Sequence, residues 1–265
     1  MSLAAKDAAS ASTRNMKSRG WRSRTTRGFA WLYAAPILVN AGIYNASPQP
    51  DFWTADRSSA GLLPAATQDA PAIVRIYAAR TVRWRGIFAV HTWLVVKDAG
   101  GAYERYDVTA FGRDPLVRDR FEADARWFGK TPETVFAADG EDAEKLIAPI
   151  KAAIEAYPHR KFGDYVVWPG PNSNTFVAHV MGAAGIGAAL PSLAIGKDFP
   201  SDGRWVGLTP SRTGARVTLN GLAAVTIGWY EGVEVNVLGG VAGIDIRRPA
   251  IKLPALGRFG VAAWP

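Results

Sequence analysis

The chain has 265 residues, of which 48% are hydrophobic and ten are Trp, so it is long enough to bury a large core and is not composed like a disordered protein. It contains no Cys, which excludes disulfides, thiolate zinc sites and a cysteine nucleophile. The formal net charge is +8, but residues 1–27 hold seven Lys or Arg and one Asp, a net +6, which leaves +2 for the rest. This distribution argues against a domain with a basic face for nucleic acid, and we expect no nucleic acid as a partner.

The basic tail, residues 1–27, is followed by GFAWLYAAPILVNAGIY, residues 28–44, which holds no charged side chain. Cations before an apolar stretch are typical of a segment inserted with its N-terminus in the cytoplasm. These 17 residues would span about 25 Å as a helix, slightly less than the hydrocarbon core of about 30 Å, and Pro36 and Asn40 weaken the segment. We expect an uncleaved membrane anchor; a secretory signal and a buried helix of the main domain are the alternatives.

Residues 45–72 are rich in Pro, Ala and Ser and are interpreted as a linker, after which residues 73–265 form a single domain. Strands are predicted over 72–80, 86–97 and 102–111, with a turn at Ala99-Gly100-Gly101 between the last two. The segment 86–97 is apolar on both alternating faces, which predicts a central strand covered on both sides. Residues 112–140 are expected to form loops and short helical pieces.

An amphipathic helix is predicted over residues 141–157, where the apolar residues Leu146, Ile147, Ile150 and Ile154 share one side. From about residue 205 the chain is β-rich, and from Gly214 it consists of strands and Gly turns. We interpret this part as a β-meander that completes the sheet, although its low charge also permits contact with a membrane surface or a partner. The predicted fold class is α+β, an antiparallel sheet with packed helices.

The segment WPGPNSNTFVAHVMG, residues 168–182, places several polar side chains where an apolar helix begins. Asn172 is expected as the N-cap and Ser173 as the first helical residue. At about 100° per residue, Ser173 lies on the same side as the apolar residues Phe176, Val177 and Val180. Its hydroxyl is therefore expected near free backbone N–H groups and the positive end of the helix dipole, which suits an oxyanion hole.

A serine nucleophile needs a base, and the chain offers three His. His179 lies about 240° around the helix from Ser173, and His159 sits in a polar loop after a helix. His91 remains, on a strand between apolar neighbours, where its ring needs a polar partner. These positions suggest a triad of Ser173 as nucleophile, His91 as base and Asp107, on the next strand, as the group that orients the base.

Structural roles are the alternative for each of these residues. Asn-Ser-Asn at a helix start is typical of capping, and a single His in a strand is typically a satisfied core residue. Asp107 has Arg105 and Arg83 as further candidate partners. For a site at Ser173 we expect substrate contacts from Asn172, Asn174, Thr175, Trp93 and Trp168, and we expect no metal or cofactor.

Five segments carry a resemblance to a known family: ADRSSAG (55–61), WRGIFAVHTW (84–93), WPGPNSNTF (168–176), AIGKDF (194–199) and GIDIRRPAIKLP (243–254). Together they resemble the bacterial family called domain of unknown function 3750, over about residues 50–260. The resemblance implies an envelope protein of Gram-negative bacteria with an N-terminal membrane segment, and it supplies no activity. With the charge pattern, it predicts a single pass through the inner membrane, a cytoplasmic N-terminus and a periplasmic domain.

The order of a strand with His, a second strand and a helix that opens Asn-Ser-Asn-Thr-Phe-Val is similar in layout to the permuted papain-like enzymes. These include the lecithin retinol acyltransferase and NlpC-type families, whose helix opens with Asn-Cys and has Phe three residues after the Cys. On that pattern Ser173 takes the nucleophile's place, His91 the base's, and Asp107 is the nearest candidate for the third polar group. Ser replaces Cys here, and a hydroxyl ionises far less readily than a thiol.

Two functions follow as hypotheses. The first is a membrane-anchored hydrolase or acyl transferase that uses Ser173 and His91 on a cell-wall or lipid substrate. The second is a non-catalytic envelope module on the same scaffold, which binds a wall, lipid or protein partner. In that case Asn172 to Thr175 form a structural turn, and Ser173→Ala is expected to cost about 1 kcal/mol of stability without a loss of function.

Overall fold

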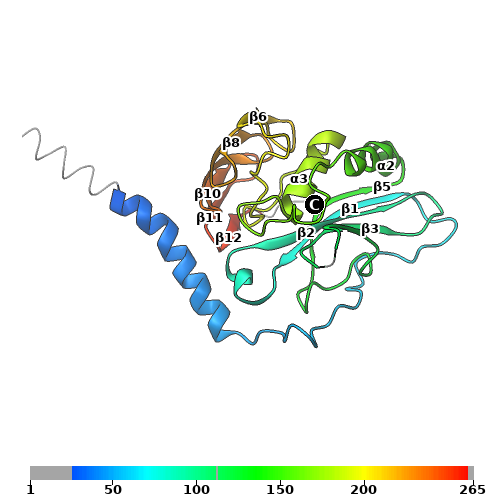
Figure 1. Ribbon diagram of the computed structural model, residues 1–265, viewed down its shortest axis with the longest axis horizontal. Coiled ribbons are helices and arrows are strands. Elements are labelled where there is room, and N and C mark those ends of the chain that lie inside the picture. The colour runs from blue at the N-terminus through cyan, green and yellow to red at the C-terminus, as the bar shows by residue number, and fades with distance from the viewer. Residues whose placement is uncertain (1–25, 112, 262–265) are drawn as a thin grey trace, which may run out of the picture.

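The structure is a computed structural model that describes residues 26–111 and 113–261. Two antiparallel sheets and the helices packed with them make up the main body, which confirms the α+β class (Figure 1). The first sheet has five strands in the order β4-β3-β2-β1-β5. Its strands are β1 (Ile73–Arg80), β2 (Val90–Lys97), β3 (Glu104–Val108), β4 (Leu116–Arg118) and β5 (Glu133–Asp139).

The strand predicted over 86–97 is central in the sheet, as expected, and every residue of β2 is buried. It begins later than predicted because a 3-10 helix, η1 (Arg83–Ile87), occupies the first part of that segment. The prediction of loops and short helical pieces for residues 112–140 was wrong in two places, where β4 pairs with β3 and β5 pairs with β1 as the two edge strands. Every residue of β5 is exposed or only half-buried, and its apolar run is only four residues long, from Val135 to Ala138, between charged residues at both ends.

Two helices, α2 (Gly140–Glu155) and α3 (Ser173–Ala184), pack on one face of the first sheet. The predicted apolar side of α2 is buried at Ile147, Ile150 and Ile154, while Leu146 is half-buried. Phe176, Val177 and Val180 of α3 are almost fully buried, as predicted. The strands contribute their even-numbered residues to this core, among them Val74, Leu94 and Val96.

The opposite face of the first sheet is covered by loops rather than by helices. Trp93 and Val95 of β2 pack there with Trp127 and Phe128. Part of the expected linker reaches this face, since Phe52 stacks on Phe128 with ring centroids 4.8 Å apart. Residues 45–72 thus include segments that pack on the domain.

The second sheet has seven strands in sequential order. They are β6 (Val206–Leu208), β7 (Gly214–Leu219), β8 (Ala223–Gly228), β9 (Gly232–Val237), β10 (Gly240–Asp245), β11 (Ala250–Leu253) and β12 (Gly257–Gly260). The expected β-meander is present, but it forms a sheet of its own and does not complete the first one. Its inward residues are polar and bond to the loop 194–199, as Thr218 and Arg216 do with the carbonyls of Asp198 and Lys197.

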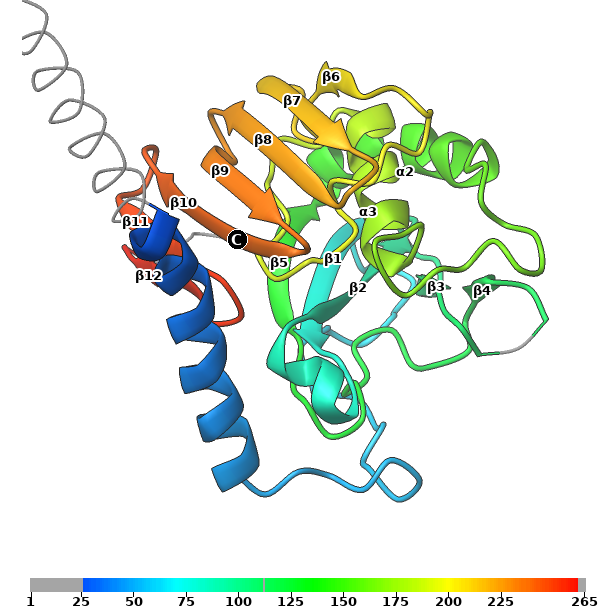
Figure 2. The same ribbon diagram turned by 60° about the vertical axis from the view of Figure 1, so that its left-hand side comes forward.

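The segment expected as a membrane anchor is helical, in a helix that covers at least residues 26–46 (Figure 2). One side of this N-terminal helix contacts the domain. Asn40 donates to the carbonyls of Ile87 and Ala255, and the Tyr33 hydroxyl donates to the carbonyl of Val235. Across residues 26–111 and 113–261, every helix is too short or too polar to cross a membrane. Most of the predicted basic tail, residues 1–25, lies outside the described residues.

Candidate functional site

The first turn of α3 is held by Asn172, which is the N-cap as predicted. Its Oδ1 accepts the N–H groups of Asn174 and Thr175, at 2.9 Å and 3.3 Å. Thr175 completes a capping box, because its hydroxyl accepts the Asn172 N–H at 3.1 Å. The loop at Gly196 closes over this turn so tightly that a Cβ there would lie within 2.7 Å of the Asn172 amide. The capping role therefore belongs to Asn172, and Ser173 takes no part in it.

The same turn is fixed across the start of β2, on either side of His91 along the strand. Asn174 donates to the carbonyl of Val90 at 3.0 Å, and the Thr92 hydroxyl donates to Oδ1 of Asn174 at 2.9 Å. The Thr92 hydroxyl also lies 3.4 Å from the Ser173 carbonyl. Because neighbouring residues of a strand point to opposite faces, Thr92 faces α3 and His91 faces the aromatic side of the sheet.

The His91 ring is held between an aromatic plane and a carboxylate. It stacks on Trp127, with ring centroids 3.8 Å apart and planes 13° from parallel. Its Nε2 lies 2.8 Å from Oδ1 of Asp107, so the predicted pairing of these two residues is present. His91 is 4% exposed and Asp107 is fully buried.

Arg105 is the third member of this buried network. Its guanidinium binds Asp107 through two hydrogen bonds, Nε to Oδ2 at 2.6 Å and Nη2 to Oδ1 at 3.0 Å. It also donates to the carbonyl of Glu122 and lies 4.2 Å from the centroid of the Trp93 ring. A buried carboxylate with a cation and an imidazole beside it stays ionised, since both neighbours stabilise the charged form.

These contacts define the protonation state of the network. Burial lowers the pKa of His91, and the hydrogen bond to Asp107 offsets this only in part. Burial raises the pKa of Asp107, but the Arg105 charge and the His91 hydrogen bond outweigh it and leave that pKa below its usual value. A neutral imidazole beside an ionised carboxylate carries its proton on Nε2, because the carboxylate can only accept. The lone pair of His91 is then on Nδ1.

His91 and Ser173 both line a cavity of about 650 Å³. Most of its other lining residues are apolar or aromatic. The N-terminal helix contributes Phe29, Tyr33 and Ile37, and η1 with the residues after it contributes Trp84 and Phe88. Phe111 comes from the segment after β3 and Leu238 from the β9–β10 turn. The cavity has the size of a small-molecule site. His91, Asn172, Ser173 and Asn174 line it where β2 and α3 begin, and Thr81, Arg85 and Thr109 add polar groups from other segments.

Ser173 is 3% exposed and borders the cavity, but no hydrogen bond joins its hydroxyl to His91 in residues 26–111 and 113–261. In the same ranges, the backbone N–H of Ser173 donates no hydrogen bond, whereas the next two amides are taken by Asn172. One amide thus remains for an anionic oxygen, where the sequence suggested a larger set of free N–H groups.

The five residues expected around a substrate are placed differently from one another. Trp168 lines the cavity, and its indole donates to the carbonyl of Leu238 at 3.1 Å. Asn172 and Asn174 also border it, but both side chains are engaged in bonds within the protein. Thr175 and Trp93 do not line the cavity: the Thr175 hydroxyl donates to Gly196, and the Trp93 indole donates to Ala123.

The other two His lie apart from this cavity. His179 bonds to the Ser201 hydroxyl at 3.1 Å, consistent with the prediction that it faces away from Ser173. His159 is half-buried against the rings of Tyr157 and Phe199, and so less solvated than its polar loop suggested. Over the described part of the chain, there is no group of three His, Asp or Glu side chains placed to hold a metal ion.

Sequence reasoning missed two parts of this site. Trp127 lies in a segment without a regular pattern, so nothing local indicates that it stacks on His91. The contribution of the N-terminal helix to the cavity was not predicted, because the apolar stretch was interpreted as a membrane segment. Asn40 inside that stretch was a sign that the helix makes a polar contact. Arg105 was considered only as a competing partner of Asp107, and it belongs to the same network.

The fold and site define a class: an α+β protein with two antiparallel sheets, in which an apolar cavity meets a buried His–Asp–Arg network. Residues 71–199 match the family described as "Protein of unknown function (DUF3750)", which confirms the expected resemblance to that family over this segment. The match is narrower than the expected 50–260 and ends before the second sheet. No curated protein matches the chain. No solved structure matches it either.

Proposed function

We propose that the protein is a membrane-associated serine hydrolase or acyl transferase that takes the acyl chain of a lipid into the apolar cavity. The observation that carries this proposal is that His91 and Ser173 border one apolar cavity, with the lone pair of His91 left on Nδ1. An acyl chain suits such walls better than a cell-wall peptide, because the amides of a peptide would lose hydrogen bonds to water there. Attachment to the bacterial inner membrane through the N-terminal segment remains part of the proposal.

The proposed chemical step uses His91 and Ser173, which both line the cavity. Nδ1 of His91 takes the Ser173 hydroxyl proton as Oγ attacks the carbonyl carbon of an ester. The backbone N–H of Ser173 is available to the oxyanion, as in other acyl transfers. When the C–O bond breaks, the leaving alcohol takes the proton from His91, and water or a second alcohol then releases the acyl group from Oγ. The step requires Oγ and Nδ1 to approach to about 2.6–3.2 Å in the substrate complex.

An activity-based probe tests this proposal. The full chain is treated with a fluorophosphonate that carries a long alkyl chain, which phosphonylates an activated serine. We expect labelling of the wild type and none of Ser173→Ala. Ser192→Ala is the matched control, since Ser192 is also buried and its hydroxyl has no hydrogen-bond partner, but it lines a different cavity. Loss of labelling in both variants, or in neither, contradicts the role of Ser173.

The second candidate is a non-catalytic module that binds an acyl chain in the same cavity. The missing hydrogen bond between Ser173 and His91 in the described residues favours it. A fluorescent fatty acid that binds wild type and Ser173→Ala equally, in a protein that no fluorophosphonate labels, supports this alternative. The layout of β2, β3 and α3 is compatible with either a serine variant of a papain-like scaffold or a scaffold without catalysis.

A further inference from the structure

The second sheet has a continuous apolar row on its outward face. Its pairing places six residues side by side from β7 to β12, in the order Ala215, Ile227, Val233, Ile244, Ile251 and Phe259. All are exposed or half-buried, with Ile227 57% and Ile251 51% exposed. Val217 and Val225 extend the same face over β7 and β8. We call these outward side chains of β7 to β12 the outer sheet face.

The inward face of the same strands is polar and buried. The residues next to the apolar row include Arg216, Thr226, Glu234 and Lys252. Lys197 and Lys252 bind the two carboxylate oxygens of Glu234, at 2.5 Å and 2.6 Å. A sheet with one face in water normally places its polar residues outward. Here the order is reversed, so the outer sheet face is suited to an apolar surrounding.

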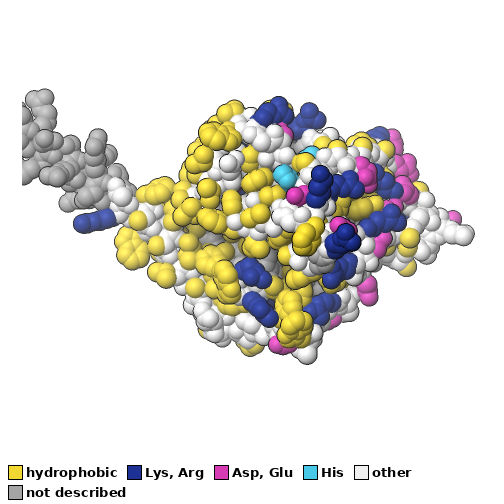
Figure 3. All heavy atoms as spheres, viewed as in Figure 1, with side chains coloured by type: hydrophobic (Ala, Val, Ile, Leu, Met, Phe, Trp, Pro, Cys, Tyr) yellow, Lys and Arg dark blue, Asp and Glu magenta, His cyan; other side chains and the backbone are white. Residues whose placement is uncertain are grey.

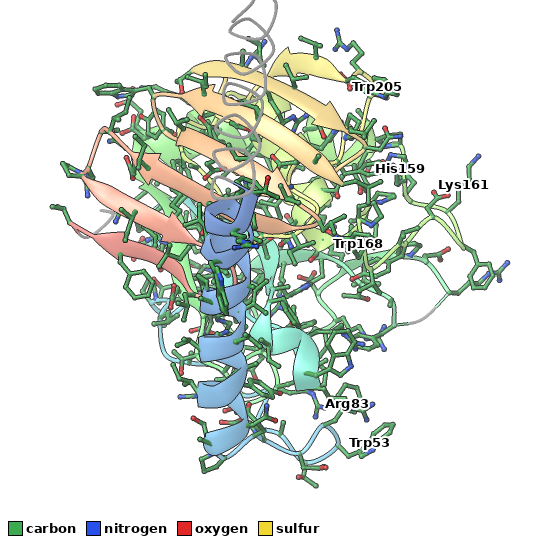
Figure 4. All side chains as sticks on the ribbon, turned by 90° about the vertical axis from the view of Figure 1, so that its left-hand side faces the viewer. Trp53, Arg83, His159, Lys161, Trp168 and Trp205 are labelled. Carbon is green, nitrogen blue, oxygen red and sulfur yellow. The ribbon has the colours of Figure 1, made fainter. Side chains whose placement is uncertain are left out.

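The N-terminal helix extends this surface. Its inner side contacts the sheet through Tyr33, while Trp31, Leu38 and Ile43 are 63%, 64% and 55% exposed. In Figure 3, hydrophobic side chains gather over this helix and the second sheet, and charged side chains gather over the other end of the molecule. Figure 4 looks onto the second sheet with the helix in front of it, and Trp205 lies at one end of the sheet.

We infer that the outer sheet face and the outward side of the N-terminal helix dock together on a lipid bilayer with anionic headgroups. Residues 1–25, which precede this helix, hold six Lys or Arg and one Asp. Such a segment is attracted to anionic lipid, and it is joined to the start of the helix that lies beside the second sheet (Figure 2). The exposed Trp205 and Trp229 next to the outer sheet face suit the membrane–water boundary.

A second copy of the chain fits this surface less well. Oligomers are mostly symmetric, so two copies that met through this face would each bring a cationic tail to one interface. Like charges held together in this way repel, whereas an anionic bilayer neutralises both tails. The inference does not depend on reactivity at Ser173, since a binding module would dock in the same way.

Sedimentation of the full chain with vesicles tests the inference. The vesicles contain phosphatidylcholine with or without phosphatidylglycerol. We expect binding to increase with the fraction of anionic lipid. In the double variant Ile227→Glu/Ile251→Glu we expect binding to fall about tenfold or more, because two apolar side chains that would contact the bilayer are replaced by charged ones. The control is Trp53→Glu/Phe162→Glu, which adds the same charge at side chains that are 76% and 78% exposed; Trp53 lies at the far end of the molecule from the sheet (Figure 4).

A second measurement locates the contact. The chain has no Cys, so Val225→Cys and Trp53→Cys can each be labelled with an environment-sensitive dye. We expect vesicles to shift the emission to the blue only at position 225. Equal vesicle binding by both double variants and the wild type overturns the inference. It is also overturned if the wild type is a dimer in solution that Ile227→Glu/Ile251→Glu dissociates, with no vesicle-dependent shift at position 225.

Discussion

Nε2 of His91 lies 2.8 Å from Oδ1 of Asp107, and this bond determines which ring nitrogen is left for chemistry. Since Arg105 keeps Asp107 ionised, the carboxylate accepts the Nε2 proton and the lone pair lies on Nδ1. The pair is buried on the aromatic side of the first sheet, next to Trp127. Protonation of His91 should therefore change the free energy of unfolding as well as the activity.

The first prediction concerns pH. The pKa of His91 is lowered from 6.5 by burial, so below that pH the unfolded chain binds more protons than the folded one. The contribution of neutral His91 to the free energy of unfolding is therefore fully present above about pH 6.5. It is lost as the pH falls toward the lowered pKa of the folded state. Urea unfolding of the wild type between pH 5 and 8 should show this loss, and His91→Gln should reduce it.

His179 contributes to the same loss, because burial also lowers its pKa. His179→Gln is thus the matched control, and each variant should remove a part of the pH dependence while the double variant removes more than either. A His91→Gln profile parallel to that of the wild type would show that His91 is not held neutral by its surroundings.

The second prediction separates capping from chemistry at the start of α3. Asn172→Ala removes the acceptor for two backbone N–H groups and should cost about 1–2 kcal/mol in free energy of unfolding. Ser173→Ala removes no hydrogen bond of the cap and should cost less than about 0.5 kcal/mol. Urea unfolding curves of the two variants measure this difference. Equal losses would mean that Ser173 contributes to the start of α3 as much as the Asn172 cap does.

The third prediction concerns Gly196, whose φ is +97° and whose missing Cβ leaves room for the Asn172 amide. Gly196→Ala should destabilise the protein through both backbone strain and this overlap. Gly203→Ala is the control, because φ is +74° there and the space around it is open. We expect about 1–3 kcal/mol more loss in free energy of unfolding for Gly196→Ala. Similar losses would mean that the loop at Gly196 is not packed on Asn172.

The fourth prediction concerns the buried charges under the second sheet. Glu234→Gln leaves Lys197 and Lys252 without their shared carboxylate and should cost about 3–5 kcal/mol in free energy of unfolding. Glu141→Gln removes a surface ion pair with Lys145; the side chains of Glu141 and Lys145 are 82% and 62% exposed. This substitution should change the free energy of unfolding by about 0.5 kcal/mol or less. Denaturant titrations compare the two, and a small effect of Glu234→Gln would contradict the inverted polarity of the sheet.

Local signals in the sequence were sufficient to predict how α3 begins. Asn172 as N-cap, Ser173 at the first helical position and the buried Phe176 all follow from capping and helical spacing, which depend on neighbouring residues. Asp107 could be named as a candidate partner of His91 because it lies on the next strand of the predicted hairpin.

Contacts between residues far apart in the sequence could not be predicted from such local signals. The alternation of Ile227 with Thr226 and of Ile251 with Lys252 shows that β8 and β11 have one polar and one apolar face, but not which face is buried. That choice depends on the loop at Lys197, which bonds to Glu234 nearly 40 positions away in the chain. The stacking of Trp127 on His91 likewise depends on the path of an irregular loop.

The most direct measurement maps the residue that reacts in the cavity. The full chain is incubated with a long-chain fluorophosphonate, digested, and its peptides are analysed by mass spectrometry. We predict a single adduct on Ser173 that is lost in His91→Gln and Asp107→Asn while both variants remain folded by circular dichroism. An adduct on another serine, or undiminished labelling of Ser173 in folded His91→Gln, would contradict the proposed role of His91 as the base.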